Sequence, residues 1–570
     1  MLSKALWFNR SIWLQHFRNI GWIAIVHLLL LLAIVPLPIM MAYTNGKNQL
    51  DYLRGLKNVF DISAPFQGML VFTIPVLLGI FLFRYMQVKQ SADYMHSLPF
   101  RRESLFTQHM MLGGMILLVP LVFTALVVSV LCYWLPLDRI ASADIVLWIA
   151  EVFLMEMFVF AVSVFVGMLT GISVLQGIFA YILFLFPAGI FVLVLTNMRY
   201  VLAGFAADYY LNANIEKIVP FIRFIELSMR DFSLQEAIGY LFLTGLCIVM
   251  ALWMYRKRPS EAANQALAFP ILRPVFLFGV PFCFMLVGGI YFREVMNGSF
   301  GWILFGYMVF SIIGFLVAEM VIEKTWRVFH KWKGYVYFLL PMLLVGTVLY
   351  FDLTGYEKRM PKLADIEKVY FGDSVSRFDI DTQQRENHSL IEQPNQFLSS
   401  KENIQNVYIF HEQLIANKPT LPSPFADTKR VVIGYVLKNG DRLIRVYDVP
   451  TDPYMPFYKQ IIESNEYKQN YYFILREKEV APIRQVTIMM GDERFKEIVL
   501  SDPKEISGFM EGLKNDLRQE SAESILKNHE SWGTIELLQS DGDMIYVTWK
   551  KTYANIEKWL SRQKLLPNHR

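Results

Sequence analysis

Long apolar runs fill the first three-fifths of the chain, from residue 21 to residue 353. A transmembrane helix needs about 20 mostly apolar residues, because the hydrocarbon core is ~30 Å thick. The runs that meet this length cover residues 21–43, 66–83, 110–135, 145–169, 174–195, 237–255, 275–292, 301–322 and 336–353. The stretch from Ile145 to Leu195 is too long for one helix, and we divide it at the small and polar turn Thr170 to Ser173. The pattern predicts nine membrane-spanning helices.

Residues 354–570 show the mixed, partly alternating pattern of a folded soluble domain, with a weak internal repeat at an offset of 102 residues. Helix-start residues near Ser399 and Ser501 are each followed 40 residues later by a hairpin turn, Asn439-Gly440 or Asp541-Gly542. Matching apolar stripes lie between them: Ile404, Val407, Tyr408 and His411 in the first copy, and Ile506, Phe509, Met510 and Leu513 in the second. Chance alignment of two common hairpins is the alternative, but the helix-start residues, the apolar stripe and the hairpin turn all repeat at the same offset. Each copy is expected to run strand, helix, hairpin and final helix.

The predicted fold class is a mainly α membrane protein with about nine transmembrane helices and a C-terminal α+β soluble domain made of two tandem repeats. The expected parts are an interfacial amphipathic helix (1–20), a six-span unit (21–256), three additional spans (257–353) and the two soluble repeats (354–480 and 481–570). The first repeat carries a polar insertion between Gly372 and Phe397.

Composition and charge agree with a multi-pass membrane protein. Hydrophobic residues make up 54% of the 570 positions and charged residues only 18%, which is outside the range of ordinary soluble proteins. With the N-terminus inside, the loops on that side hold fifteen Lys and Arg against nine in the opposite loops, so the positive-inside rule favours a cytoplasmic N-terminus. An odd number of spans then places residues 354–570 outside the cell. An error in the division at Thr170 would move them to the cytoplasm.

The sequence carries no signature of catalysis, cofactor binding or metal binding. It has no G-x-x-x-x-G-K-[ST] phosphate loop, no H-E-x-x-H and no G-x-S-x-G motif. All three cysteines, Cys132, Cys247 and Cys283, lie in predicted spans, so a disulfide or Cys-based metal site in the soluble domain is excluded. A net charge of +4 without a basic face carrying aromatic residues argues against nucleic-acid binding. We therefore expect a protein that is not an enzyme and that needs no cofactor.

Ionisable residues inside spans are the default functional candidates, and two of them, Glu151 and Glu156, lie in the fourth span. Five positions apart on a helix, their side chains point about 140° away from each other, so they do not form an acid/base pair. We expect helix contact or cavity lining, with the lining of a substrate path as a minority interpretation. His27 and Glu319 are expected to be packing or interfacial groups.

The loop Ser91 to Phe106, after the second span, is amphipathic, mixed in charge and interrupted by Pro99. Two interpretations are equally supported by the residues alone. The loop either docks on a partner protein, or it is a positively charged connector that only fixes the topology through Arg84, Lys89, Arg101 and Arg102.

Three short segments within residues 1–270 resemble the ABC-2 type permease subunits of Gram-positive bacteria. They are the loop Ser97-Leu98-Pro99 followed by Arg101-Arg102-Glu103-Ser104-Leu105-Phe106, the turn Met168-Leu169-Thr170-Gly171 with Gln176, and the loop Tyr255-Arg256-Lys257-Arg258-Pro259-Ser260-Glu261-Ala262. Each segment is short, and they occur in the order loop, turn, loop within a six-span unit.

The resemblance implies a role for each end of this unit. The loop of about Ser91 to Phe106 would be a coupling helix that docks on a separate ABC ATPase subunit, through Asp93, Leu98, Pro99, Arg101, Arg102 and Glu103. The amphipathic segment 1–20 would match the family's connecting helix, and a homodimer or a sister permease would complete the transport path. The three extra spans and the C-terminal domain depart from the family's pattern, which leaves the role of residues 275–570 open.

Two hypotheses from different classes follow. The first is the membrane-spanning permease subunit of an ATP-driven ABC exporter in the cell membrane. The second is a membrane sensor or scaffold whose extracellular repeat domain binds an envelope ligand and signals through the spans. A membrane enzyme would need clustered acidic or histidine residues at one membrane face, which the sequence does not show, and four-span permeases with a large external domain place that domain between spans. Neither hypothesis identifies a substrate.

Overall fold

The computed structural model describes residues 10–44, 55–97, 101–135, 140–258, 273–296, 299–378, 397–417, 428–476, 481–490, 497–527 and 530–565. By its internal contacts the chain divides into two compact units. Unit 1 comprises Met1–Leu193, Ala213–Gly288 and Tyr307–Leu339. Unit 2 comprises Val194–Asn212, Gly289–Gly306 and Leu340–Arg570.

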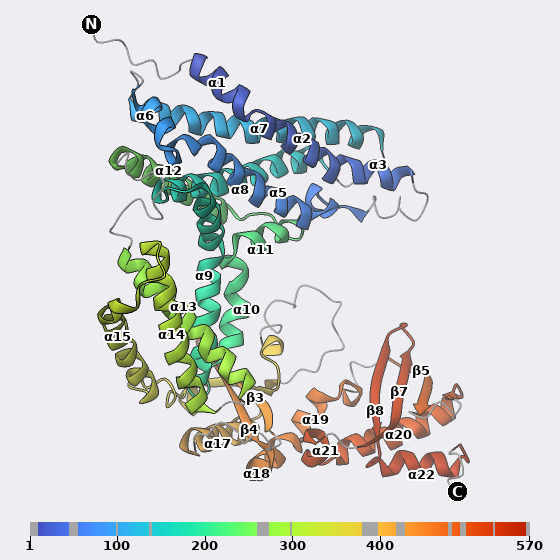
Figure 1. Ribbon diagram of the computed structural model, residues 1–570. Coiled ribbons are helices and arrows are strands. Elements are labelled where there is room, and N and C mark those ends of the chain that lie inside the picture. The colour runs from blue at the N-terminus through green and yellow to red at the C-terminus, as the bar shows by residue number, and fades with distance from the viewer. Residues whose placement is uncertain are drawn as a thin grey trace. The chain divides into compact units, whose positions relative to one another are not determined.

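Within the described ranges, nine helices are long and apolar enough to cross a membrane, which confirms the predicted number (Figure 1). The first span combines α2 (Trp22–Ile34) and α3 (Pro36–Thr44), and the last, Phe329–Tyr350, contains α15 (Trp332–Tyr350). The other seven are α5 (Ala64–Leu82), α7 (Arg102–Trp134), α8 (Ser142–Leu169), α9 (Ser173–Val201), α12 (Leu234–Lys257), α13 (Arg273–Val295) and α14 (Phe300–Glu323). The chain is therefore a multi-pass membrane protein.

The helix boundaries follow the sequence closely, with the largest differences at the start of the third span, the end of the fifth and the start of the ninth. The division at Thr170 to Ser173 is confirmed, because α8 ends at Leu169 and α9 begins at Ser173. The third span begins at Arg102 rather than at residue 110. Residues 102–109 are too polar to count as membrane-spanning, but Leu105 and Phe106 are buried, so packing extends the helix beyond its apolar run. Shorter helices connect the spans: α1 (Arg10–Ile20), α6 (Lys89–Ser97), α10 (Ala207–Ile218) and α11 (Pro220–Ile225).

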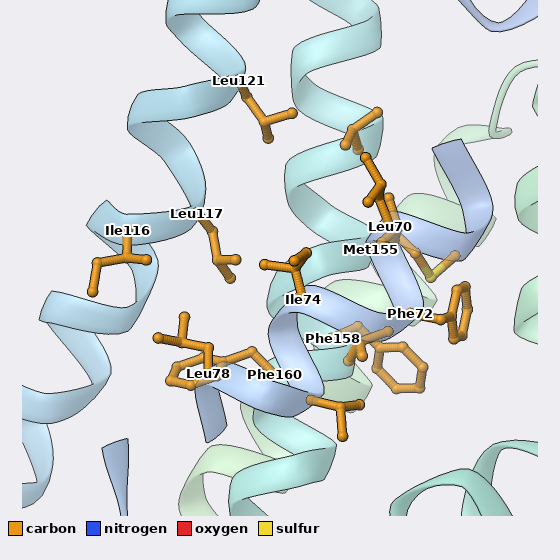
Figure 2. Packing of buried hydrophobic residues seen from close by; sticks show 14 of the residues in the cluster. Leu70, Phe72, Ile74, Leu78, Ile116, Leu117, Leu121, Met155, Phe158 and Phe160 are labelled. Atoms are coloured by element: carbon orange, nitrogen blue, oxygen red, sulfur yellow. The ribbon is translucent and has the colours of Figure 1, made fainter. Parts of the chain in front are cut away.

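The core of unit 1 is built where α5 packs against α7 and α8 (Figure 2). Its buried side chains include Leu70, Ile74 and Leu78 from α5, Ile116, Leu117 and Leu121 from α7, and Met155, Phe158 and Phe160 from α8. Glycines allow the close approach, because a Cβ at Gly79 would lie 2.5 Å from Oγ of Ser163, and one at Gly113 would lie 2.3 Å from the ring of Phe160. Small residues are typical of such helix contacts in membranes.

The C-terminal part of unit 2 contains two small antiparallel sheets of four strands. The first, sheet A, consists of β1 (Ile366–Gly372), β2 (Phe397–Leu398), β3 (Thr428–Leu437) and β4 (Arg442–Pro450), with helices α17 (Lys401–Asn417), α18 (Thr451–Ile462) and α19 (Asn465–Tyr471). The second, sheet B, consists of β5 (Ile483–Met490), β6 (Ile498–Leu500), β7 (Ser531–Gln539) and β8 (Met544–Lys550), with helices α20 (Pro503–Gln519), α21 (Ala522–Leu526) and α22 (Ala554–Arg562).

The two sheets repeat one topology, which confirms the predicted tandem duplication. Sheet A has the order β2-β1-β3-β4 and sheet B has the order β6-β5-β7-β8. The registers also correspond, since Val369 pairs with Leu398 and Tyr435 while Val486 pairs with Leu500 and Leu537. Both predicted hairpin turns contain a glycine with positive φ, Gly440 at 86° and Gly542 at 98°. The short edge strands β2 and β6 were not predicted, because two or three residues carry no alternation signal.

Within unit 2, the segment Val194–Asn212, which contains the end of α9, packs on one face of sheet A. Ala206 joins a buried cluster with Phe378 and Val446, and the Val446 amide donates to the carbonyl of Gly204 at 3.2 Å. Arg199 lies 3.4 Å from a carboxylate oxygen of Asp448 on β4. This contact agrees with the four described spans between α9 and sheet A, because an even number of spans returns the chain to the side of the membrane at which α9 ends.

Candidate functional site

The three segments that carry the family resemblance meet at one end of unit 1, where α7 begins and α12 ends (Figure 1). Nη1 of Arg102 donates to the carbonyl oxygens of Tyr255 at 3.4 Å, Arg256 at 3.3 Å and Arg258 at 3.1 Å. The last four carbonyls of a helix have no partner within it, and they form the negative end of its dipole. Arg102 therefore caps α12 and joins it to the first turn of α7.

A second arginine makes the same kind of link between α12 and α8. Nη1 of Arg258 donates to the carbonyl oxygens of Gly167 at 2.7 Å and Met168 at 3.0 Å, in the last turn of α8, and Nη2 donates to that of Met86 at 3.4 Å. Arg258 is buried, and this burial lowers its pKa to about 10. Its guanidinium thus keeps its charge at neutral pH, where the carbonyl end of α8 stabilises it.

A glutamine pair fixes the turn between α8 and α9 to the 3₁₀ helix Arg84–Gln87 that follows α5. Nε2 of Gln87 donates to Oε1 of Gln176 at 2.6 Å, and Nε2 of Gln176 donates to the carbonyl of Ser163 at 3.0 Å. Both glutamines are buried. Two aromatic hydroxyls add a further link, since Oη of Tyr85 donates to Oη of Tyr255 at 3.0 Å. We call the assembly of Arg102, Arg258, Gln87 and Gln176 the helix-end joint.

The residues expected to contact an ATPase lie in different environments around this joint. Asp93, on α6, and Arg101 are exposed, and Glu103 forms a half-exposed ion pair with Arg256 at 3.1 Å. Arg102 faces inward and belongs to the joint. Leu98 and Pro99 lie outside the described residues. The joint residues Gln87 and Arg258 were not assigned a role from the sequence. A basic residue directly after the last turn of a span is the signal that could have indicated Arg258.

The two carboxylates of the fourth span lie in separate surroundings, in agreement with their expected divergence on the helix. Glu156 faces α2, where Nε2 of His27 lies 3.0 Å from its Oε1, and both side chains are fully buried. Glu156 is thus a helix-contact residue. His27, expected to be a packing group, is its partner. Glu319 forms ion pairs with Arg273 at 3.2 Å and Lys331 at 3.6 Å, near the end of α14.

Glu151 lines a cavity. Its Oε1 accepts a hydrogen bond from the backbone amide of Phe232 at 2.7 Å, and the residue is only 4% exposed. The cavity has a volume of about 1250 Å³ and lies at the end of α8 and α12 opposite to the helix-end joint, between α8, α9, α11 and α12. Its walls carry both ionisable and aromatic side chains.

Nothing in the described parts of the chain groups three or more His, Cys, Asp or Glu side chains in a way that could hold a metal ion. No family model matches the chain, and no curated protein or solved structure matches it either. The helix-end joint and the cavity are therefore the two features of the molecule from which a function can be inferred.

Proposed function

We propose that this chain is the membrane-spanning permease subunit of an ATP-driven ABC transporter, an exporter whose ATP is hydrolysed by a separate subunit. The observation that carries the proposal is the helix-end joint. Three segments that are far apart in the sequence, and that were singled out for their resemblance to permeases, form one hydrogen-bonded assembly. The exposed residues Asp93 and Arg101 lie in the chain directly before this assembly.

The joint offers a mechanical route from a docked ATPase to the transport path. A force on α6 would reach the start of α7, which Arg102 holds to the end of α12. Arg258 then holds α12 to the end of α8. At their other ends α8 and α12 line the cavity, so a movement of the joint would change the shape of the cavity. Such a coupled rigid-body movement is how alternating access works in transporters.

The orientation in the proposal follows the distribution of positive charge. The N-terminus and the helix-end joint would face the cytoplasm, and the two soluble repeats would lie outside the cell. A second copy or a sister permease would provide the other half of the transport path. The location would be the cell membrane, with the lipid bilayer covering the apolar helices.

The test is to purify the tagged chain from its native membrane in mild detergent and to identify the chains that co-purify. Charge reversal at the two exposed positions, Asp93→Arg and Arg101→Glu, should remove a stoichiometric Walker-motif ATPase without unfolding the protein. Lys57→Glu, at an exposed position on the cavity end of unit 1, is the matched control and should keep the ATPase. If no ATPase co-purifies with the unmodified chain, the permease proposal is wrong and a sensor or scaffold becomes the better hypothesis.

A further inference from the structure

The cavity of unit 1 has a polar end, which we call the mouth, and an apolar remainder. Ionisable residues gather where α8 and α12 begin, and they include Asp144, Arg230, Asp231 and Glu236. Farther along the same helices the walls become apolar and aromatic, with Phe158, Val162, Phe184, Tyr240 and Leu243. A volume of about 1250 Å³ exceeds the range of about 300–1,000 Å³ that is usual for small-molecule sites. The shape and polarity suit a ligand with a polar head and a hydrophobic tail.

Of the three basic side chains in the cavity wall, Arg223 and Arg230 are already engaged, and the third, Lys57, is exposed. Arg223 is 1% exposed and makes four hydrogen bonds. Its Nε and Nη2 donate to the two carboxylate oxygens of Glu236, each at 3.1 Å, while the carbonyls of Arg230 and Asp231 accept the other two. Arg230 also donates to Glu236, at 3.2 Å. This clamp shapes the mouth, and little of its positive charge is left for an anionic ligand.

Glu151 differs from every other ionisable group in the cavity wall. It lies nine residues into α8, about 13 Å from its start at 1.5 Å per residue. Its Oε1 accepts from Phe232, but its Oε2 is buried and has no hydrogen-bond donor among the described residues. A buried carboxylate oxygen without a partner costs about 1–3 kcal/mol or more. Trp148, Phe158 and Tyr240 line the same cavity, and aromatic faces attract cations.

We propose that this cavity binds an amphipathic organic cation, an amine with one hydrophobic tail. The ammonium group would donate to Oε2 of Glu151 and lie against the aromatic rings, while the tail would extend along Val162, Phe184 and Leu243. Binding of this kind does not need an ATPase. Only the further step, that the bound amine is the exported substrate, rests on the proposed function.

The experiment is photoaffinity labelling of the full chain in phosphatidylcholine nanodiscs, without any ATPase. The probe is a dodecylamine that carries a diazirine in its chain, and labelled peptides are identified by mass spectrometry. We expect labels on the cavity walls of α8, α9 and α12. Unlabelled dodecylamine should compete at least tenfold better than dodecanol or dodecyl sulfate, because only the ammonium group both donates a hydrogen bond to the carboxylate and neutralises its charge.

Two variants locate the head of the ligand. Glu151→Gln should reduce the labelling of the cavity at least tenfold, and Glu151→Asp, which keeps the charge, should retain the preference for amine over alcohol. Glu156→Gln is the matched control, because it removes a buried carboxylate from the same helix outside the cavity, and it should label as the unmodified chain does.

Labelling spread evenly over lipid-facing helices, or equal competition by the alcohol, would overturn the proposal. Better competition by the sulfate would show an anion site and would overturn it too. If size-exclusion chromatography shows that Glu151→Gln does not fold, the competition between amine, alcohol and sulfate on the unmodified chain still tests the proposal. Because the assay contains no ATPase, its failure is independent of any failure of the permease proposal.

Discussion

His411 on α17 makes the stability of the first repeat sensitive to mild acid. The side chain is fully buried, with its Nδ1 3.1 Å from Oη of Tyr435 and its Nε2 3.0 Å from Oη of Tyr447. Burial, and to a lesser degree the nearby positive charge of Arg445, lowers the pKa of His411 to about 3. The corresponding position of the second repeat is Leu513, which cannot titrate. The second repeat is therefore an internal control.

The magnitude follows from the difference between this pKa and the ordinary value of 6.5. The unfolded state binds the proton below pH 6.5, whereas the folded state binds it only near pH 3. The free energy of unfolding therefore falls as the pH drops from 6.5 towards 3, by about 1.4 kcal/mol per pH unit. Between pH 7.5 and pH 5 the loss is about 2 kcal/mol, or roughly a 30-fold increase in the open population. Glu466 and Glu520, whose pKa values are lowered, lose their stabilising contribution only below about 4.5, outside this range.

The assay is hydrogen exchange of the full chain at pH 7.5 and pH 5, followed by mass spectrometry and corrected for the intrinsic rate at each pH. Peptides from α17 and β3 should exchange about 30-fold faster at pH 5 after correction, whereas those from α20 and β7 should not. His411→Gln keeps a hydrogen-bonding side chain but removes the titration, so it should abolish the difference. An equal pH response in both repeats, or a response that survives in His411→Gln, would refute the reasoning.

Three further perturbations test the packing of unit 1 by thermal unfolding of the purified protein. Arg258→Ala should lower stability by about 3 kcal/mol, because it leaves buried carbonyls without their charged donor, and no change would show that the joint is dispensable. His27→Leu and Glu156→Leu should each lower the free energy of unfolding by about 3–5 kcal/mol. The double variant should be about as stable as the unmodified chain, because it leaves no unpaired buried group. If the two losses of stability simply added in the double variant, this prediction would be contradicted. Gly79→Ala should cost about 1–3 kcal/mol through its clash with Ser163, and an unchanged melting temperature would mean that α5 and α8 pack less closely than described.

The spans and the repeat could be predicted because their signals are local. A run of about 20 apolar residues specifies a membrane helix by its length, and the turns at Gly440 and Gly542 need a residue that tolerates positive φ. The apolar run predicts the third span from residue 110, but it could not show that the helix itself begins at Arg102, because the burial of Leu105 depends on neighbouring helices rather than on hydropathy.

The contacts of the candidate site could not be predicted from the sequence. Glu156 and His27 lie far apart in the chain, and only the packing of α8 on α2 brings them within 3.0 Å. Helical geometry could show that Glu151 points elsewhere, but it could not show that one of its oxygens lacks a donor. Likewise, the positive charge of Arg102 predicted a cytoplasmic loop, while its role as a cap for α12 depends on where that helix ends.

The central claim is that an ATPase docks beside the helix-end joint, and site-specific photocrosslinking in native membranes tests it most directly. A photoreactive amino acid at position 93 or position 101 should crosslink to a Walker-motif ATPase, and the same residue at position 57, on the cavity end of unit 1, should not. Crosslinks to an ATPase from positions 93 and 101 alone are the result that the proposal predicts. The absence of an ATPase from both crosslinks, with the protein expressed and folded, would contradict it.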